Sequence, residues 1–193
     1  MFSLEVNVIN TIVTSKEAIL AASRELASKE GLQSLNMRTV AKKCNVSVGS
    51  VYNYFPSKGD LIAETVQDLW QSIFYIDKIS NKTDSFTDYV AWIFESVHLG
   101  IEEYPNFFTA HSMSFANTDK GKAREVMEKY FDHMKAELLM ALEKDNNIKA
   151  AVFSDYFSKS AFVDFVFSNL LNLLMKQENS CNILIEVIKR CIY

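Results

Sequence analysis

The residues from Ala41 to Val51 have the types and spacing needed to place one short helix on DNA. Ala41 is small where a first helix must approach a second one closely, and Val51 is apolar where that pair would pack against a third helix. Asn45 occupies the turn position that often needs a positive φ, which Asn tolerates better than most residues. Ser47 would cap the second helix and leave amides exposed to a phosphate. This pattern predicts a helix-turn-helix, which docks its second helix in the major groove.

The charge distribution is uneven along the chain. The net charge is −4, yet residues 14–60 hold seven basic and four acidic groups, which gives +3. Residues 61–193 hold thirteen basic and nineteen acidic groups, which gives −6, and Glu5 supplies the remaining −1. We expect the positive end to lie on phosphate and the negative end to be kept off it. An excess of three charges also arises by chance in so short a window, so it supports the motif without establishing it.

Helical spacing of apolar residues recurs along the chain and predicts an all-α fold. Five glycines and two prolines are too few for a protein built of many strands and turns. Thr14 and Glu17 have the spacing of a capping box, Asn36 and Ser47 would cap the next two helices, and Gly31 would end the first. We expect about nine helices, near residues 14–30, 36–43, 47–55, 58–77, 84–103, 107–116, 122–144, 149–176 and 180–192.

The run from Arg38 to Leu61 resembles the signature of the TetR (tetracycline-repressor-like) family. The signature has an apolar residue, Ala, a turn Gly and Val-Ser, followed by Tyr-x-Tyr-Phe-x-x-Lys-x-x-Leu, and this chain reads VAKKCNVSVGSVYNYFPSKGDL from residue 40. The resemblance covers about residues 14–62. Asn45 stands where the family usually has Gly, and Val48 replaces a commonly polar residue at the start of the recognition helix.

The resemblance implies a three-helix head followed by a larger helical body. We therefore expect a helix-turn-helix DNA-binding domain over residues 1–60, with its ordered motif at 14–60, and an effector-binding and dimerisation domain over residues 61–193. By matching position, it also implies which residues contact DNA. These are Arg38, Lys42, Ser47, Val48, Gly49, Ser50, Tyr52, Asn53, Tyr54 and Lys58.

The expected DNA contacts differ in kind. Arg38 could reach a base or a phosphate, whereas Val48 could make only apolar contact, for instance with a thymine methyl. Lys58 would pair with a phosphate. Some residues of this segment also have a purely structural interpretation. Tyr52 and Phe55 could be core aromatic residues, which we favour for Phe55, and Lys42 could be a solvated surface charge.

The segment 149–176 is apolar nearly all round, although a single amphipathic helix needs only one apolar stripe. The excess suggests burial on two sides, one against its own body and one against a second copy of the chain, in agreement with the homodimer that the resemblance implies. The alternative is a central helix buried in a monomer. The expected dimer-interface residues are Phe153, Phe157, Phe167, Leu171, Leu174, Ile183 and Val187.

The resemblance also implies a small-molecule pocket in the body. Aromatic residues and methionines at helical spacing are more often plain core than pocket wall, and a lone His is usually a hydrogen-bonded core residue. The richness in Phe favours an apolar or aromatic effector. The candidate pocket residues are Trp92, Glu95, His98, Phe107, His111, Met134 and Phe165.

The sequence does not indicate an enzymatic function, because it contains no phosphate-loop, nucleophile-elbow or zinc-binding motif. We expect no catalytic residues, no metal and no cofactor. Cys44, Cys181 and Cys191 are odd in number and far apart, which favours a reduced compartment. The start lacks signal-peptide features, and the most apolar stretch is shorter than the ~20 residues that a spanning helix needs. We therefore expect a cytoplasmic protein without a membrane segment.

Three functions remain open from the sequence. The first is an effector-responsive repressor that binds a palindromic DNA operator as a homodimer. The second is an architectural or protein-partnered DNA-binding factor of the same fold that has no small-molecule effector. The third is a helical enzyme or binding module with an incidental helix-turn-helix, which predicts no salt-dependent DNA affinity.

Overall fold

The computed structural model describes residues 14–75, 85–107 and 121–193. These residues form eight α-helices and no strand, which confirms the predicted all-α fold. Two short 3-10 helices, Leu32–Ser34 and Ala150–Val152, lie between them. The α-helices are α1 (Lys16–Glu30), α2 (Met37–Lys43), α3 (Val48–Tyr52), α4 (Lys58–Tyr75), α5 (Phe86–Glu103), α7 (Lys122–Lys144), α8 (Lys159–Met175) and α9 (Asn182–Ile192).

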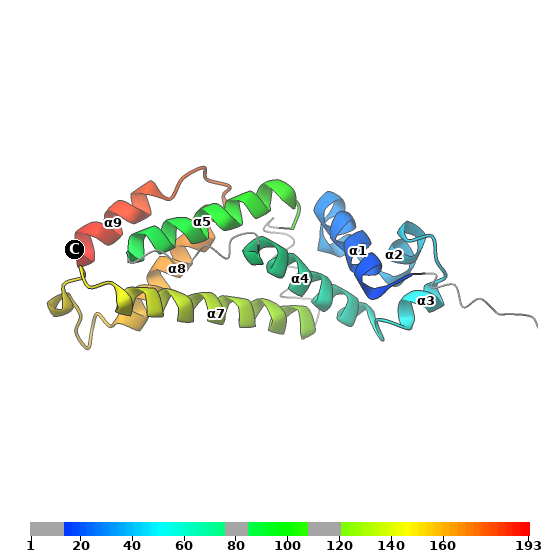
Figure 1. Cartoon of the computed structure of the whole chain (residues 1–193), viewed down its shortest axis with the longest axis horizontal. Coiled ribbons are helices and arrows are strands. Elements are labelled where there is room, and N and C mark those ends of the chain that lie inside the picture. Colours follow the sequence, from blue (N-terminus) through cyan, green and yellow to red (C-terminus); the bar gives the residue numbers. More distant parts are fainter. Residues whose placement is uncertain (1–13, 76–84, 108–120) are drawn as a thin grey trace, which may run out of the picture.

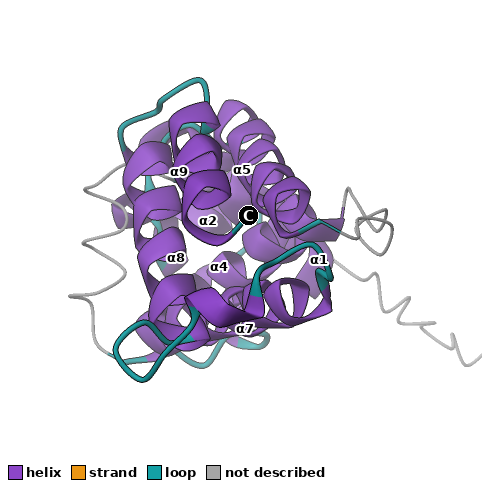
Figure 2. Cartoon of the chain, turned by 90° about the vertical axis from the view of Figure 1, so that its left-hand side faces the viewer, coloured by secondary structure: helices purple, strands orange, loops and turns teal. Residues whose placement is uncertain are grey.

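The helices form a small head and a longer body. Helices α1, α2 and α3 lie together at one end of the molecule, and α4 runs from this head toward the body (Figure 1). Beyond the end of α4, α9 packs on α5 and α8 at the far end of the body (Figure 1 and Figure 2). Helix α4 packs on α1 in the head and on α5 and α7 in the body. It is therefore the main structural link between the two parts. The predicted domain boundary at residue 60 falls in its first turn and stays a prediction.

Short side chains set the beginnings of the helices. The first helix is capped by Ser15, whose hydroxyl accepts a hydrogen bond from the Ala18 amide, and not by Thr14 as expected. Asn36 forms a capping box with Thr39, and Ser47 caps α3, both as predicted for the N-caps. Each cap pairs an amide that the helix itself leaves unsatisfied.

One continuous apolar core extends through the described residues. In the head, Ile19, Val40, Val51 and Phe55 are each fully buried, which agrees with the core role favoured for Phe55. In the body, Trp70 is buried where α4 faces α7. None of the described helices is long and apolar enough to cross a membrane.

Two predicted helices differ from the structure, and one cannot be compared. The helix expected over 149–176 begins only at Lys159, because Ser158 caps it and the preceding residues form a 3-10 turn and a loop. Helix α3 ends at Tyr52 rather than near Phe55. The helix expected over 107–116 lies almost wholly outside the described residues.

Candidate DNA-binding site and body pocket

The turn between α2 and α3 is held by backbone geometry. Asn45 has a φ of 55°, the left-handed conformation predicted for this position. The Val46 amide donates to the Ala41 carbonyl at 3.0 Å, and the Cys44 amide donates to the Val40 carbonyl at 2.9 Å. These bonds fix the direction in which the chain leaves α2. They therefore fix the orientation of α3.

Helix α3 buries only Val51 and turns its remaining residues toward solvent to different degrees. The Ser47 hydroxyl accepts from the Ser50 amide at 3.1 Å, and the two serine hydroxyls lie 2.9 Å apart. Because they share one hydrogen bond, they act as a pair toward any ligand. Gly49 is exposed between them, and a Cβ placed there would meet only the Ser47 hydroxyl, at 3.6 Å. Val48 is half-buried against the core.

Most basic residues of the head are already neutralised by acidic partners. Lys16 pairs with Glu64, and Arg24 lies 3.1 Å from Asp68. Lys29 and Lys43 both bind Glu25, and their Nζ atoms lie 2.8 and 2.7 Å from its Oε1. The hydrogen bond from Lys29, and after it the one from Lys43, lowers the pKa of Glu25 to about 2, so this carboxylate stays charged at neutral pH.

Three further cations of the head are those expected on DNA. Arg38 and Lys42 are exposed, stand four residues apart on one side of α2, and form no ion pair with any residue that the structure describes. Lys58 is exposed at the first position of α4. The charge of Arg38 and Lys42, for which the structure describes no acidic partner, thus lies on α2, which packs against α3.

The tyrosines after α3 differ in their surroundings. Tyr52 is 51% exposed. The Tyr54 hydroxyl donates to the Thr14 carbonyl at 2.8 Å, so it ties the recognition helix to the segment before α1 and has no proton left for a phosphate. Asn53 is exposed at the C-cap of α3.

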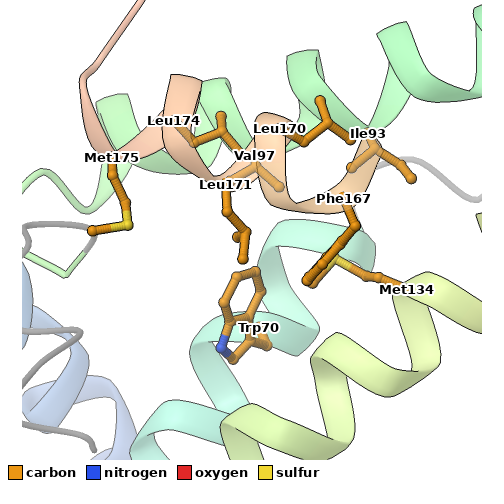
Figure 3. A pocket seen from close by; sticks show the side chains of 9 residues that line it. All are labelled: Trp70, Ile93, Val97, Met134, Phe167, Leu170, Leu171, Leu174 and Met175. Atoms are coloured by element: carbon orange, nitrogen blue, oxygen red, sulfur yellow. The ribbon is translucent and has the colours of Figure 1, made fainter. Parts of the chain in front are cut away.

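A pocket of about 430 Å³, measured up to its open mouth, lies in the body between α4, α5, α7 and α8 (Figure 3). Every side chain that lines it is apolar. The side chains leave room inside for about one water-sized group, so a larger ligand would have to displace them. The lining residues are Trp70, Ile93, Val97, Met134, Phe167, Leu170, Leu171, Leu174 and Met175.

Of the residues predicted for a pocket, Met134 lines this one. His98 stacks on Phe94, Trp92 stacks on Tyr89, and Glu95 is exposed, so these three do not reach it. Phe165 is 48% exposed on the outside of α8, and Phe107 lies behind the wall against Trp70. His111 lies outside the described residues.

The pocket wall could not be selected from the sequence, because plain aliphatic residues such as Val97 and Leu170 look the same in a pocket and in a core. The partial signal was the nearly all-round apolar character of α8, which supplies five of the lining residues. The expectation from the sequence assigns one side of this helix to its own body and the other to a second chain.

Some of the expected dimer-interface residues are buried within the chain, and others are exposed. Phe167 and Leu174 are each only 5% exposed and pack against their own body. Leu171 is half-buried at the pocket. Phe153 and Phe157 stack on each other and on Phe162 within the chain. Ile183 and Val187, which are 84% and 38% exposed, remain open on α9.

The head matches a known family of DNA-binding proteins. The model of the bacterial regulatory proteins of the tetR family matches residues 19–65, which run from α1 through the helix-turn-helix into α4. The helix-turn-helix head is of the TetR-family type. The TetR-type head accounts for the fixed turn, the exposed α3 and the cations beside it. The chain is thus a DNA-binding transcriptional regulator.

The likeness to TetR-family proteins extends beyond the head. The chain is 29% identical over 177 residues to the HTH-type transcriptional repressor KstR of Mycobacterium tuberculosis, which covers 87% of this chain and 74% of KstR. It is 27% identical over 134 residues to the nucleoid occlusion factor SlmA of Actinobacillus pleuropneumoniae, over 67% of this chain and 65% of SlmA.

A solved structure shares the fold of nearly the whole chain. The transcriptional regulator FadR of Bacillus subtilis, solved in complex with stearoyl-CoA, superimposes with a TM-score of 0.62. The superposition covers 93% of this chain and all of FadR at 14% sequence identity, which establishes the fold alone.

Proposed function

We propose that this chain is an effector-responsive repressor that binds a palindromic operator as a homodimer in the bacterial cytoplasm. The observation that carries the proposal is the pairing of a rigid, exposed α3 with an apolar pocket in the body, the two being linked through α4. The name of KstR, a transcriptional repressor, supports the sign of regulation.

We assign the DNA contacts to the exposed side of α2 and α3 and to the start of α4. Arg38, Lys42 and Lys58 would bind phosphates or, for Arg38, a base edge. Gly49 would allow close approach of the backbone, and the hydroxyl pair of Ser47 and Ser50 would offer hydrogen bonds in the groove. The exposed Tyr52 and Asn53 would contact the sugar-phosphate backbone, and Tyr54 would hold α3 in place rather than donate to DNA.

We propose a dimer because one such head reads too few base pairs for useful specificity. Two heads joined by a two-fold axis would reach half-sites about 34–36 Å apart, or a multiple of it. The exposed apolar side chains of Phe165 on α8 and of Ile183 and Val187 on α9 support an interface on these last helices. Where exposed apolar side chains form a contiguous patch, they mark a site of protein–protein interaction.

We propose an uncharged, largely apolar effector for the body pocket. A charged group placed among the nine apolar lining residues would lose its hydration without gaining a partner, which costs several kcal/mol. Met134 and Met175 are flexible side chains that could rearrange around a ligand larger than the present space. The stearoyl chain of the stearoyl-CoA bound to FadR, a protein of the same fold, belongs to this apolar class, whereas the CoA part of that ligand is charged.

The decisive experiment is DNA binding by the full chain as a function of salt. Duplexes selected by the protein from a random pool should contain an inverted repeat, and the logarithm of the association constant should fall with that of salt by about 0.9 per phosphate contacted. Selected sequences without symmetry would contradict the dimeric operator. A chain without salt-dependent DNA affinity would contradict DNA binding altogether.

A second candidate is a DNA-binding factor that acts through a protein partner and has no effector. The small free space in the pocket and the match to SlmA, a nucleoid occlusion factor, favour it. Calorimetry with neutral apolar compounds separates the two candidates. An effector-responsive repressor should bind one of them and release its operator, whereas a protein-partnered factor should bind none.

A further inference from the structure

A short turn after α5 lies between the pocket wall and the head. Tyr104, Pro105, Asn106 and Phe107 form it, and the Phe107 amide donates back to the Tyr104 carbonyl at 3.0 Å. Pro105 restricts the backbone at the second position of the turn. Tyr104 and Phe107 are buried at its two ends. The turn is therefore stiff, and a push on one end moves the other.

Asn106 joins this turn to the C-terminus of α1. Its side-chain amide donates to the carbonyls of Ser28 and Lys29, at 2.8 and 2.9 Å. These carbonyls belong to the last turn of α1, where the helix supplies no amide for them. The Ser28 hydroxyl in turn donates to the Glu103 carbonyl at 3.1 Å. The end of a head helix is thus held by residues of the body.

Phe107, the next residue, touches the pocket wall. Its ring meets the indole of Trp70 edge to face, with ring centroids 5.9 Å apart. Trp70 lines the pocket, and Leu171 points toward its ring from α8 (Figure 3). A ligand that displaces Leu171 would therefore press on Trp70. Because the surrounding core is closely packed, Trp70 cannot shift without moving Phe107.

We infer that occupancy of the pocket is transmitted to the DNA-binding head through Trp70, Phe107 and Asn106, which together move the C-terminus of α1. The inference rests on the proposed effector-responsive function and names the regulation of that site. Helix α1 carries the motion onward, because Glu25 on α1 binds Lys43 at the end of α2. The pull is applied at the end of α1 far from Thr14, so it tilts α1 and, with it, the helix-turn-helix.

This route is separable from a rigid movement of α4, which also contains Trp70. Helix α4 contacts α1 through the Lys16–Glu64 and Arg24–Asp68 ion pairs and needs no part of the turn. The two routes make opposite predictions for a chain that lacks the Asn106 amide. If the turn carries the signal, the head of that chain no longer responds to the pocket.

The test replaces the unknown ligand by a larger side chain. Leu171→Phe fills the pocket beside Trp70, and Met134→Phe fills it from α7 as a second, independent variant. Each is combined with Asn106→Ala in the full chain. Two quantities are measured: affinity for a duplex selected by the unmodified protein, by gel shift, and amide hydrogen exchange over residues 24–31 of α1.

Each filling variant should change both quantities by about fivefold or more, the low end of typical allosteric coupling. In the Asn106→Ala chain, the same filling should change them by less than about twofold, the usual error of additivity. Asn169→Ala is the matched control, because its side-chain amide also donates to a helix carbonyl, that of Phe165 at 2.8 Å, but away from the head. Coupling should persist in it. Met140→Phe, on the exposed side of α7, should have no effect.

Two results would overturn the inference. Undiminished coupling in the Asn106→Ala chain would assign the signal to α4 instead. If α1 responds to neither filling variant, the pocket is not coupled to the head. Failure of the unmodified chain to bind any DNA would reject the proposed function, while hydrogen exchange in α1 would still decide the route.

Discussion

At the scale of single residues, Gly49 is informative because the fold itself does not require a glycine there. Its φ lies outside the left-handed region, and an added Cβ meets only Ser47 at an ordinary distance of 3.6 Å. Gly49→Leu should therefore leave the thermal midpoint unchanged or slightly higher, since glycine is a poor helix former. It should weaken operator binding about tenfold or more, or about 1.4 kcal/mol.

Gly59 supplies the control for Gly49. It is likewise the second residue of its helix, and its Cβ would lie 3.6 Å from the hydroxyl of Ser57. Gly59→Ala and Gly49→Ala should have similar effects on stability, as measured by thermal unfolding. If Gly49→Leu binds the operator as tightly as the unmodified chain, α3 does not approach the groove at this residue.

Adjacent lysines on α2 should differ in their contribution to DNA affinity. Lys42 has no ion pair among the described residues, whereas Lys43 is bound by Glu25 at 2.7 Å. Lys42→Ala should weaken binding to all sequences about equally and reduce the salt slope by about 1 per head. Lys43→Ala should change the slope much less. Equal losses for the two lysines, measured by gel shift at several salt concentrations, would contradict this assignment.

At the scale of the elements, Asp145 fastens three segments at the far end of the body. Its carboxylate accepts from the Phe86 amide at the start of α5, from the Asn147 amide and from the Tyr193 hydroxyl. Burial alone would raise the pKa of Asp145, but the hydrogen bonds from Tyr193, Phe86 and Asn147 outweigh it and leave the pKa lowered.

This arrangement predicts an acid-dependent loss of stability. Because the folded chain holds Asp145 below the ordinary aspartate pKa of about 3.9, its contribution is fully present above that value and disappears as the pH falls through the folded pKa. Asp145→Asn should lower the thermal midpoint at pH 7, and the difference from the unmodified chain should shrink toward pH 3. A difference that does not depend on pH would show that the charge is unimportant.

The elements also show what the sequence could predict. The helix caps and the turn at Asn36, Asn45 and Ser47 could be predicted, because a single side chain determines each of them. The start of α8 was not, because apolar residues such as Phe153 and Phe157 precede Ser158 and extend the pattern, while their rings pack from a loop. Periodicity reports that a residue is buried, and it does not report the element that buries it.

The division of α8 between pocket and interface depends on three-dimensional packing in the same way. Phe165 and Phe167 are only two positions apart in the sequence, yet Phe167 is buried and Phe165 is 48% exposed. Which of them faces the body is set by where α5 and α7 lie against α8. That placement rests on contacts between distant segments, which no local pattern contains.

At the scale of the whole molecule, the proposed dimer brings two heads together so that both bind the same operator. Ile183→Glu combined with Val187→Glu should give a monomer at micromolar concentration in sedimentation, because buried carboxylates on α9 would lack partners. The salt slope of DNA binding should then fall by about half, since one head contacts DNA. Met140→Glu, at an exposed apolar position of α7, should leave the dimer intact. A double variant that remains dimeric would move the interface elsewhere.

The position of Trp70 has a practical consequence. The chain contains only two tryptophans, and one of them forms a pocket wall while the other, Trp92, stacks on Tyr89 away from it. The tryptophan fluorescence of a Trp92→Phe variant would therefore come from the pocket alone. Any compound that enters should shift or quench this emission without a label. The protein thus contains its own optical sensor, with which a library of compounds can be screened for the effector.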